Sequence, residues 1–476
     1  MDVETLKALR PALGRFCEQF RRCIKTRESR RHLRTYMEGQ LGPLERKSVE
    51  PMALEAGVPP RSLQEFLSLH HWDEERVRRR LWTLLQRDHA DEDAIAVVDE
   101  TSFAKKGDKT PGVQRQYCGA TGKPDNCVVT VHLGYASGDF HALVDGDLYL
   151  PESWAEDRER CREAGIPEDV DYRAKWQIAL DLLDRTTEGG VRFRWLTADE
   201  GYGRSAEFRE GVAARGLLYV VEVPVTERGW TRLPRMEQPG AGRRGPTPKT
   251  PRVAPGEPPP REVRSLWKRG GPSWKTYRVK DTEKGPVVWE VRESAFWPSR
   301  DGAPGEPVRL LVAREVFTGE VKYFLTNAPL EVGVATMLCV AFSRWHVERC
   351  FEDGKGEVGM GDFEVRRYRG LQRHLVVSML SWYFLADQTD RLRRRGGKPV
   401  VDGVPGAGGR GGAAGPGALL PGEDAAAGGH GREDPLLAVA GAGGRALPRD
   451  PQEAPAASDR DRSPSGHPLP APAVAL

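Results

Sequence analysis

The sequence predicts a mixed α/β domain that is interrupted by a β-rich insertion and preceded by an all-α domain. Apolar residues recur at the helical period from residue 1 to about 90, without strand-like alternation. A short apolar run begins at Ala94, and predicted strands and helices then alternate up to residue 224. Basic, β-patterned sequence fills residues 225–330, and helical patterning returns at residues 331–396. At 476 residues with 38% hydrophobic residues, the chain is long enough for two or three domains.

The composition predicts a soluble protein. No run of about eighteen apolar residues occurs, and the first thirty residues carry many charges, so neither a transmembrane helix nor a secretory signal is predicted. We therefore expect a cytoplasmic protein without membrane contact.

Two segments are strongly basic although the net charge of the chain is only +3. Residues 21–34 hold seven Lys or Arg against one acid, and residues 228–280 hold fourteen against three, with Trp and Tyr interleaved. Cations release counterions from phosphates, and aromatic rings stack on exposed bases, so both segments suit a nucleic acid. A solvated linker is an equal alternative for such a charge run.

Residues 51–67, "PMALEAGVPPRSLQEFL", resemble a helix-turn-helix. Ala53 and Gly57 provide the small residue and the turn, and Leu63 and Phe66 provide apolar anchors in the second helix. Arg61, in that second helix, is the candidate DNA-contacting residue. A plain helical hairpin fits the same pattern.

Acids follow two of the predicted strands. The run "DAIAVVDET" predicts a buried strand ending at Asp99, and "VRFRWLTADEGYG" predicts another ending at Asp199. Between them we expect strands in "VQRQYCG", "NCVVTVHLGYA" and "FHALVDGDLYLP", and helices over residues 152–164 and 172–185; a helix, "SAEFREGVAARG", and a strand, "LLYVVEVP", follow. Asp99 and Asp199 converge if their strands are neighbours, although either acid alone is more often a turn or helix cap.

A third acid lies on the helix predicted for "RWHVERCFEDGKGEVG". Arg344, Glu348 and Lys355 fall within about 40° of one another around this helix. Three carboxylates on separate elements, Asp99, Asp199 and Glu348, are the oxygen donors that two Mg²⁺ ions require.

These three segments together resemble the DDE-type transposases of bacterial insertion sequences, which have an RNase H-like catalytic fold. The third segment resembles the Tyr-x2-Arg-x3-Glu-x6-Lys signature of one subgroup at Arg344, Glu348 and Lys355, with Ala341 at the tyrosine position. The resemblance implies an endonuclease in which Asp99, Asp199 and Glu348 hold two Mg²⁺ ions, with Mn²⁺ as a substitute. It implies that Arg344 and Lys355 bind phosphates near the scissile bond, and ion pairing between Arg344 and Glu348 is the alternative.

The resemblance also implies partners and a domain order. A helical DNA-binding domain, 1–90, would recognise the terminal inverted repeats, and a homodimer would join two transposon ends on double-stranded DNA. The catalytic domain, 91–224 and 331–396, would be interrupted by the insertion, 225–330. In the insertion the hairpin "RVKDTEKGPVVWEVRESAFW" places Trp289 and Trp297 as candidates for holding a flipped base, against burial in a core.

Residues 397–476 lack aromatic residues, Ile and Met, and we expect a disordered tail. The abrupt change in composition favours a frameshift over a native tail. Two further hypotheses stay open: a metal-dependent nuclease without strand transfer, and a defective transposase that only binds DNA.

Overall fold

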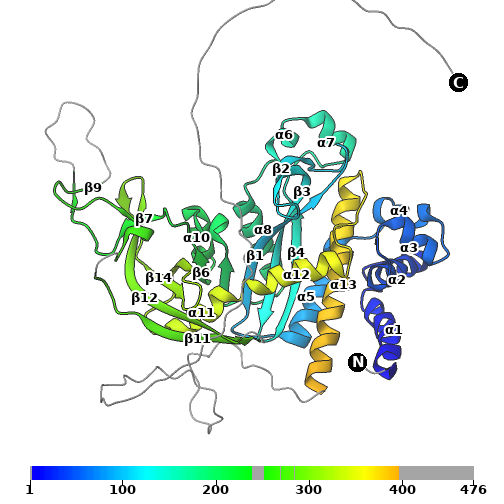
Figure 1. Cartoon of the computed structure of the whole chain (residues 1–476). Helices are drawn as coiled ribbons and strands as arrows, with labels where there is room; N and C mark the ends of the chain where they lie inside the picture. The colour runs from blue at the N-terminus through cyan, green and yellow to red at the C-terminus, as the bar shows by residue number, and fades with distance from the viewer. Residues whose placement is uncertain (1–2, 239–250, 268–269, 283–284, 396–476) are drawn as a thin grey trace, which may run out of the picture. The chain divides into compact units, whose positions relative to one another are not determined.

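The computed structural model describes residues 3–238, 251–267, 270–282 and 285–395. Its centre is a mixed sheet of thirteen strands with helices packed around it (Figure 1). The predicted mixed α/β class is therefore confirmed. Among the described residues, none of the helices combines the length and the apolar composition that crossing a bilayer requires. The predicted tail lies outside the described residues.

The middle of the sheet is built from five strands in the order β4-β3-β1-β5-β6. They are β1 (Ile95–Ala104), β3 (Lys123–Ser137), β4 (Phe140–Leu148), β5 (Trp195–Ala198) and β6 (Leu218–Glu222). The first three pair antiparallel, and β5 and β6 continue the sheet parallel to β1. A short strand, β2 (Gln114–Cys118), pairs with the start of β3. The strand β1, with both faces covered, lies at the centre of this arrangement.

Helices connect these strands where the sequence predicts them. They are α6 (Glu152–Ala155), α7 (Arg158–Ala164), α8 (Lys175–Glu188), α9 (Glu200–Gly203) and α10 (Ala206–Ala214). The helix expected over residues 152–164 is divided into α6 and α7. The division occurs at Asp157, whose carboxylate accepts a hydrogen bond from the Arg160 amide at 3.0 Å and thereby begins a new helix.

The N-terminal region consists of five helices in its described residues. They are α1 (Val3–Glu18), α2 (Arg27–Leu41), α3 (Val49–Glu55), α4 (Pro60–Ser68) and α5 (Glu74–His89). The two helices predicted around a turn are α3 and α4, and Gly57 between them has a φ of +65°, which glycine adopts without strain. Leu63 and Phe66 are fully buried. A DNA-binding role for this pair remains a prediction.

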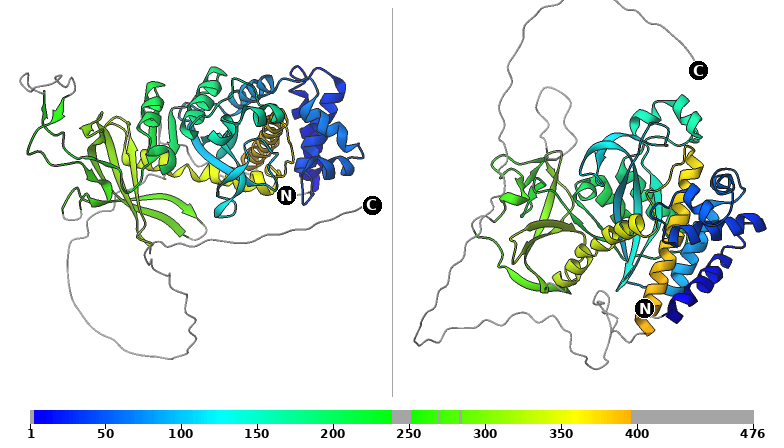
Figure 2. Two further views of the ribbon diagram at one scale, coloured as in Figure 1. Left: turned by 90° about the horizontal axis from the view of Figure 1, so that it is seen from above. Right: turned by 45° about the vertical axis from the view of Figure 1, so that its right-hand side comes forward.

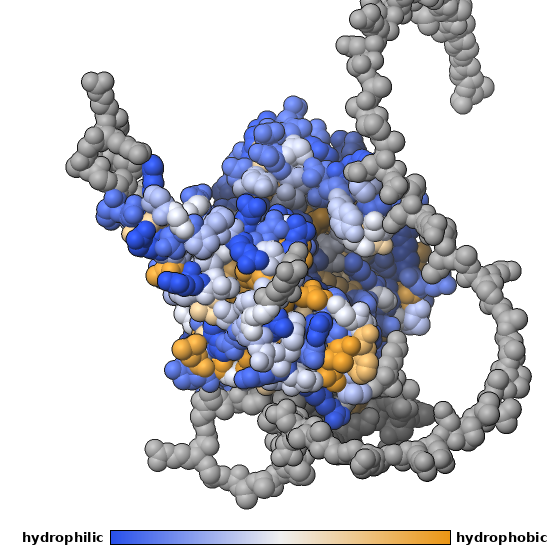
Figure 3. Space-filling view, turned by 60° about the vertical axis from the view of Figure 1, so that its left-hand side comes forward, coloured by the Kyte–Doolittle hydropathy of each residue, from blue (hydrophilic) through white to orange (hydrophobic). Residues whose placement is uncertain are grey.

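Most strands of the insertion extend the main sheet, and two of them pair with each other as a separate two-stranded sheet. The strands of the insertion are β7 (Arg228–Trp230), β8 (Met236–Glu237), β9 (Arg252–Val253), β10 (Arg261–Glu262), β11 (Lys275–Thr282), β12 (Gly285–Arg300), β13 (Ala303–Pro304), β14 (Val308–Glu315) and β15 (Val321–Thr326), with a short 3₁₀ helix, η1 (Val263–Ser265). The separate sheet consists of β8 and β9. The last strand, β15, pairs with β6 and joins the insertion to the central strands. On the face in Figure 3, hydrophilic side chains dominate and apolar ones form separate patches.

Three helices follow in the part of the chain described up to residue 395: α11 (Val334–Phe342), α12 (Trp345–Gly356) and α13 (Tyr368–Arg395). Both views of Figure 2 show α13 between the sheet and the N-terminal helices. The buried Arg373 of α13 donates to the carbonyl of His70 at 2.8 Å, and the Tyr36 hydroxyl bonds to Nδ1 of His374 at 2.8 Å. The N-terminal helices and the sheet thus share one hydrophobic core. The boundaries predicted between domains remain predictions.

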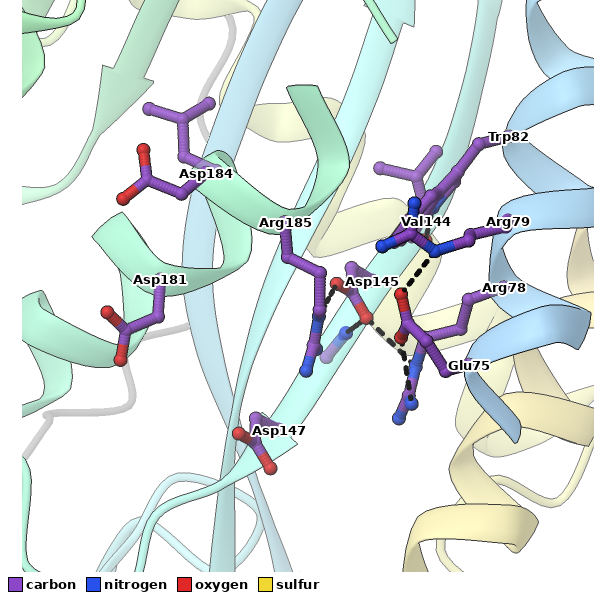
Figure 4. A network of polar contacts seen from close by, with 12 residues as sticks. Glu75, Arg78, Arg79, Trp82, Val144, Asp145, Asp147, Asp181, Asp184 and Arg185 are labelled. Atoms are coloured by element: carbon purple, nitrogen blue, oxygen red, sulfur yellow. Dashed lines mark hydrogen bonds and ion pairs between the residues drawn. The ribbon is translucent and has the colours of Figure 1, made fainter. Parts of the chain in front are cut away.

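A buried ionic cluster ties α5 and α8 to β4. The carboxylate of Asp145 is fully buried, and it lies between the guanidinium groups of Arg185 at 2.8 Å and Arg78 at 3.2 Å (Figure 4). Arg173 and Gln372 bind the neighbouring Asp147 at 2.9 and 2.7 Å. Because a buried charge without its partner is very costly, each arginine is needed once the carboxylate is inside.

We expect Arg78→Met to lower the free energy of unfolding by about 3 kcal/mol, because Asp145 loses a buried partner. Arg79→Met is the matched control: Arg79 follows on the same helix, is half exposed, and pairs with Glu75. Its cost should stay below about 1 kcal/mol. Urea denaturation of both variants checks this, and equal losses would show that the Asp145 cluster does not stabilise the fold.

Candidate active site

The two predicted aspartates lie on neighbouring parallel strands. Val98 of β1 is in register with Ala198 at the end of β5, so Asp99 and Asp199, the residue after β5, occupy matching positions. The strand predicted to end at Asp99 instead continues to Ala104, because its later residues still pair with β3. Asp199 also begins α9, because its Oδ1 accepts hydrogen bonds from the amides of Gly201 at 3.0 Å and Tyr202 at 3.3 Å. The structure therefore brings these two acids together, and it also gives Asp199 the capping role expected of a single acid after a strand.

Asp99 is a buried acid that lies beside a second carboxylate. Burial, with a smaller contribution from the Asp199 carboxylate, raises the pKa of Asp99 to about 7, and Arg344 opposes this rise. A cation added beside this buried carboxylate would favour its ionised form.

Arg344 links Glu348 to this pair of aspartates by ion pairs. Arg344 lies in the break between α11 and α12, and its Nη1 is 3.2 Å from Oδ2 of Asp99. Its Nη2 is 2.6 Å from Oε1 of Glu348, one turn along α12. One guanidinium thus bridges the first and third predicted acids. The alternative of an ion pair with Glu348 is what the structure shows, and phosphate binding by Arg344 remains a prediction.

Lys355 lies on the same side of α12, two turns after Glu348. Its Nζ is 5.6 Å from the centre of the Phe103 ring, and burial lowers its pKa while Cys118 and Asp99 work in the opposite direction. No carboxylate lies within ion-pair distance of Lys355 in the described residues. A half-buried cation without a carboxylate partner is available to an anionic ligand.

The acids match a divalent metal in donor type. Carboxylate oxygens are the ligands that Mg²⁺ prefers, and Asp99 and Asp199 place two carboxylates at matching positions. The side chains are not arranged as a closed metal site: among the described residues, no cluster of three or more His, Cys, Asp or Glu side chains is placed to hold an ion. The Arg344 guanidinium occupies oxygens of Asp99 and Glu348 instead. A metal would therefore have to compete with Arg344.

Sequence reasoning missed a bridge between the strands that carry the aspartates. The carboxylate of Glu100 accepts a hydrogen bond from the hydroxyl of Tyr202 at 3.1 Å and binds Nζ of Lys175. The amide of Glu100 donates to Oδ1 of Asp99 at 2.7 Å. Glu100 thus contacts Asp99 and the helix that follows Asp199. Its partners are far away in sequence, so strand alternation alone could not identify them.

The remaining predicted site residues contact residues other than these acids. Trp289 is 4% exposed and packs its ring 4.7 Å from that of Phe342, so the structure places it in the core. Trp297 is half-buried and pairs with Trp230 across β12 and β7. Core packing, the alternative to base binding, describes Trp289, and base binding by Trp297 remains a prediction. Arg61 is 82% exposed and pairs with Glu65 at 2.7 Å.

The fold and the acids define a class of nuclease, and comparison with known families agrees. A model of the DDE superfamily endonucleases matches residues 19–286, and the chain belongs to this family. The matched part contains Asp99 and Asp199 and ends before Glu348. A probable transposase of the insertion sequence element IS701 from Microchaete diplosiphon is 32% identical over 189 residues. That similarity covers 39% of this chain and 46% of the relative.

The raised pKa of Asp99 has a consequence for stability. The folded state holds the Asp99 proton up to about pH 7, whereas the ordinary value is 3.8, so the free energy of unfolding falls as pH rises between these values. Without metal, Asp99→Asn should therefore stabilise the protein by about 2–4 kcal/mol at pH 8.

The gain should shrink to about 1–2 kcal/mol at pH 5, where Asp99 is neutral in the folded protein but still ionised in the unfolded chain, and it should vanish only below about pH 3.8. Thermal melting of wild type and Asp99→Asn at the two pH values measures it. Glu352→Gln, at an acid that is 71% exposed on the same helix as Glu348, controls for loss of a negative charge. A destabilising effect of Asp99→Asn at pH 8 would contradict the prediction.

Proposed function

We propose that this protein is an insertion-sequence transposase that cleaves DNA with divalent metal held by Asp99, Asp199 and Glu348. The observation that carries the proposal is the register of β1 and β5, which sets two carboxylates side by side, with Arg344 linking Asp99 to Glu348. Family membership supports the nuclease chemistry. The name of the similar protein supports transposition.

The proposed fold of the catalytic domain is RNase H-like. Its support is the sequence of three antiparallel strands followed by two parallel strands, with Asp99 on the central strand β1. In this arrangement Asp99, within β1, lies beside the carboxyl end of β5, and ligands of α/β sheets gather at such strand ends.

Bound Mg²⁺ would lower the pKa of the attacking water and stabilise the leaving 3′ oxygen. Asp99, Asp199 and Glu348 would hold the metal, and Arg344 would leave the carboxylate oxygens that the metal takes. Its released guanidinium, together with Lys355, would then bind phosphate oxygens of the DNA. The same three acids would serve cleavage and the later attack of the freed 3′-OH on target DNA.

The proposed substrate is double-stranded DNA at the terminal inverted repeats, with residues 1–90 contributing to binding. The proposed assembly is a homodimer, because two ends must be joined in one complex. Joining of a labelled 3′ end to a target duplex distinguishes a transposase from a nuclease that stops after hydrolysis.

Glu348→Gln should reduce cleavage of an end duplex by about a hundredfold or more, because removing a metal ligand costs several kcal/mol of transition-state stabilisation. DNA binding should persist. A nicking assay with Mg²⁺, and with EDTA as a blank, measures the product with a free 3′-OH.

Glu352→Gln is the matched control for cleavage, since Glu352 lies one turn further along α12 and contacts Arg349. It should cut at the wild-type rate. Wild-type protein that binds the duplex but cuts in neither Mg²⁺ nor Mn²⁺ would overturn the proposed activity.

Tyr202 is proposed as a positioning residue, because its hydroxyl links the helix after Asp199 to the strand of Asp99 through Glu100. Tyr202→Phe should raise the Mg²⁺ concentration for half-maximal cleavage about tenfold, as outer partners of metal ligands do.

DNA affinity and melting temperature of Tyr202→Phe should stay near the wild-type values. Tyr219→Phe, at a buried tyrosine in the neighbouring strand β6, is the control. An unchanged Mg²⁺ requirement would remove Tyr202 from the site, and a collapse of melting temperature would assign it to folding alone.

A further inference from the structure

A groove between α1 and α2 gathers uncompensated positive charge. It encloses about 1000 Å³, and its lining contains six arginines against two acids, Glu18 and Glu28. The arginines are Arg15, Arg21, Arg27, Arg30, Arg31 and Arg34. Such a concentration of one sign is unfavourable in the free protein and becomes favourable when a polyanion binds.

Most of these arginines have no partner in the protein. Arg34 pairs with Glu38 at 3.0 Å, and Arg30 donates to the carbonyl of Lys25 at 3.0 Å. Within the described part of the chain, the remaining four arginines make no hydrogen bond or ion pair, and all four are exposed. They are Arg15, Arg21, Arg27 and Arg31. Their guanidinium groups are therefore available.

The arginines of α2 form a stripe because the other face of the helix is buried. Ser29, Leu33 and Tyr36 are among the residues that face the core. Arg27, Arg31 and Arg34 recur at the helical spacing on the outer side, over about 10 Å along the axis. That length spans two or three phosphates of one DNA strand, which follow at about 3.4 Å along the duplex axis.

The lining points to the duplex backbone and not to bases. None of the lining residues is an aromatic on which an unpaired base could stack, and arginine binds phosphate with paired N–H donors. The contrast with α4 is clear, since Arg61 is already paired with Glu65 and the helix buries Leu63, Phe66 and Leu67. Phosphate contacts of this kind position a protein without reading sequence.

We propose that the α1–α2 groove is the surface on which the phosphate backbone of double-stranded DNA docks, in place of the exposed face of α4. The identity of the polyanion as DNA rests on the proposed function. Binding in this groove is independent of base sequence and strongly dependent on salt.

The test measures binding of the full chain to a fluorescent duplex by anisotropy, in EDTA, between about 50 and 200 mM salt. Arg27→Gln/Arg31→Gln should bind more weakly, and the slope of log affinity against log salt should fall by about two. The loss in affinity across this salt range then becomes about tenfold smaller. An end duplex and an unrelated duplex should show the same change.

Three further variants test whether the effect comes from the charge of these arginines, from a loss of folding, or from their position on the surface. Arg27→Lys/Arg31→Lys should keep the wild-type slope, because lysine retains the charge. Arg162→Gln/Arg192→Gln removes two exposed charges from elsewhere and should leave binding unchanged. Arg61→Gln should change the slope of log affinity against log salt by less than about one, the change expected for the loss of one phosphate contact.

The proposal is overturned if Arg27→Gln/Arg31→Gln keeps the wild-type salt slope. It is also overturned if the lysine variant or the Arg162→Gln/Arg192→Gln control shows an equal loss of slope. Wild-type protein that binds no duplex overturns it too. Cleavage of the same duplex in Mg²⁺ is scored separately, so failure of the groove and failure of the proposed nuclease give different results.

Discussion

The parallel pairing of β1 with β5 is the constraint on which the site depends. It fixes Asp99 and Asp199 at matching positions, and burial then makes their joint ionisation unfavourable. Other contacts of the fold offset this free-energy cost. The covered strand β1, the cap that Asp199 makes on α9, and the Glu100–Tyr202 bond all hold the two acids together against their repulsion.

Arg344 resolves part of that repulsion in the absence of metal. Its guanidinium contacts both Asp99 and Glu348, and thereby supplies a positive charge at the oxygens that a divalent ion would use. Arg344 is the N-cap of α12, with helical backbone angles, and its carbonyl accepts a hydrogen bond from the amide of Val347 at 3.1 Å. The proposed exchange of the acids for phosphate would therefore be a movement of the Arg344 side chain and not of its backbone.

Local sequence patterns predicted many residues of the candidate site but few of the hydrogen bonds and ion pairs between distant parts of the chain. The strands before Asp99 and Asp199 and the stripe of Arg344, Glu348 and Lys355 follow from periodicity, which depends on neighbouring residues. The bond from Arg344 to Asp99 joins residues 245 positions apart, and the one from Tyr202 to Glu100 joins residues 102 apart. Nothing in a strand or helix pattern selects such partners. The attachment of the insertion through β15 and β6 is likewise a tertiary pairing.

The placement of α13 explains why the N-terminal helices matter beyond any contact with DNA. Its buried Arg373 holds the carbonyl of His70, and Gln372 on the same helix binds Asp147 of β4. The strand β4 pairs with β3, which in turn pairs with the strand of Asp99. A polyanion held on α1 and α2 is thus connected to the acids through buried polar bonds and sheet pairing. Cutting one of these links should therefore disturb metal binding as well as stability, because the sheet positions Asp99.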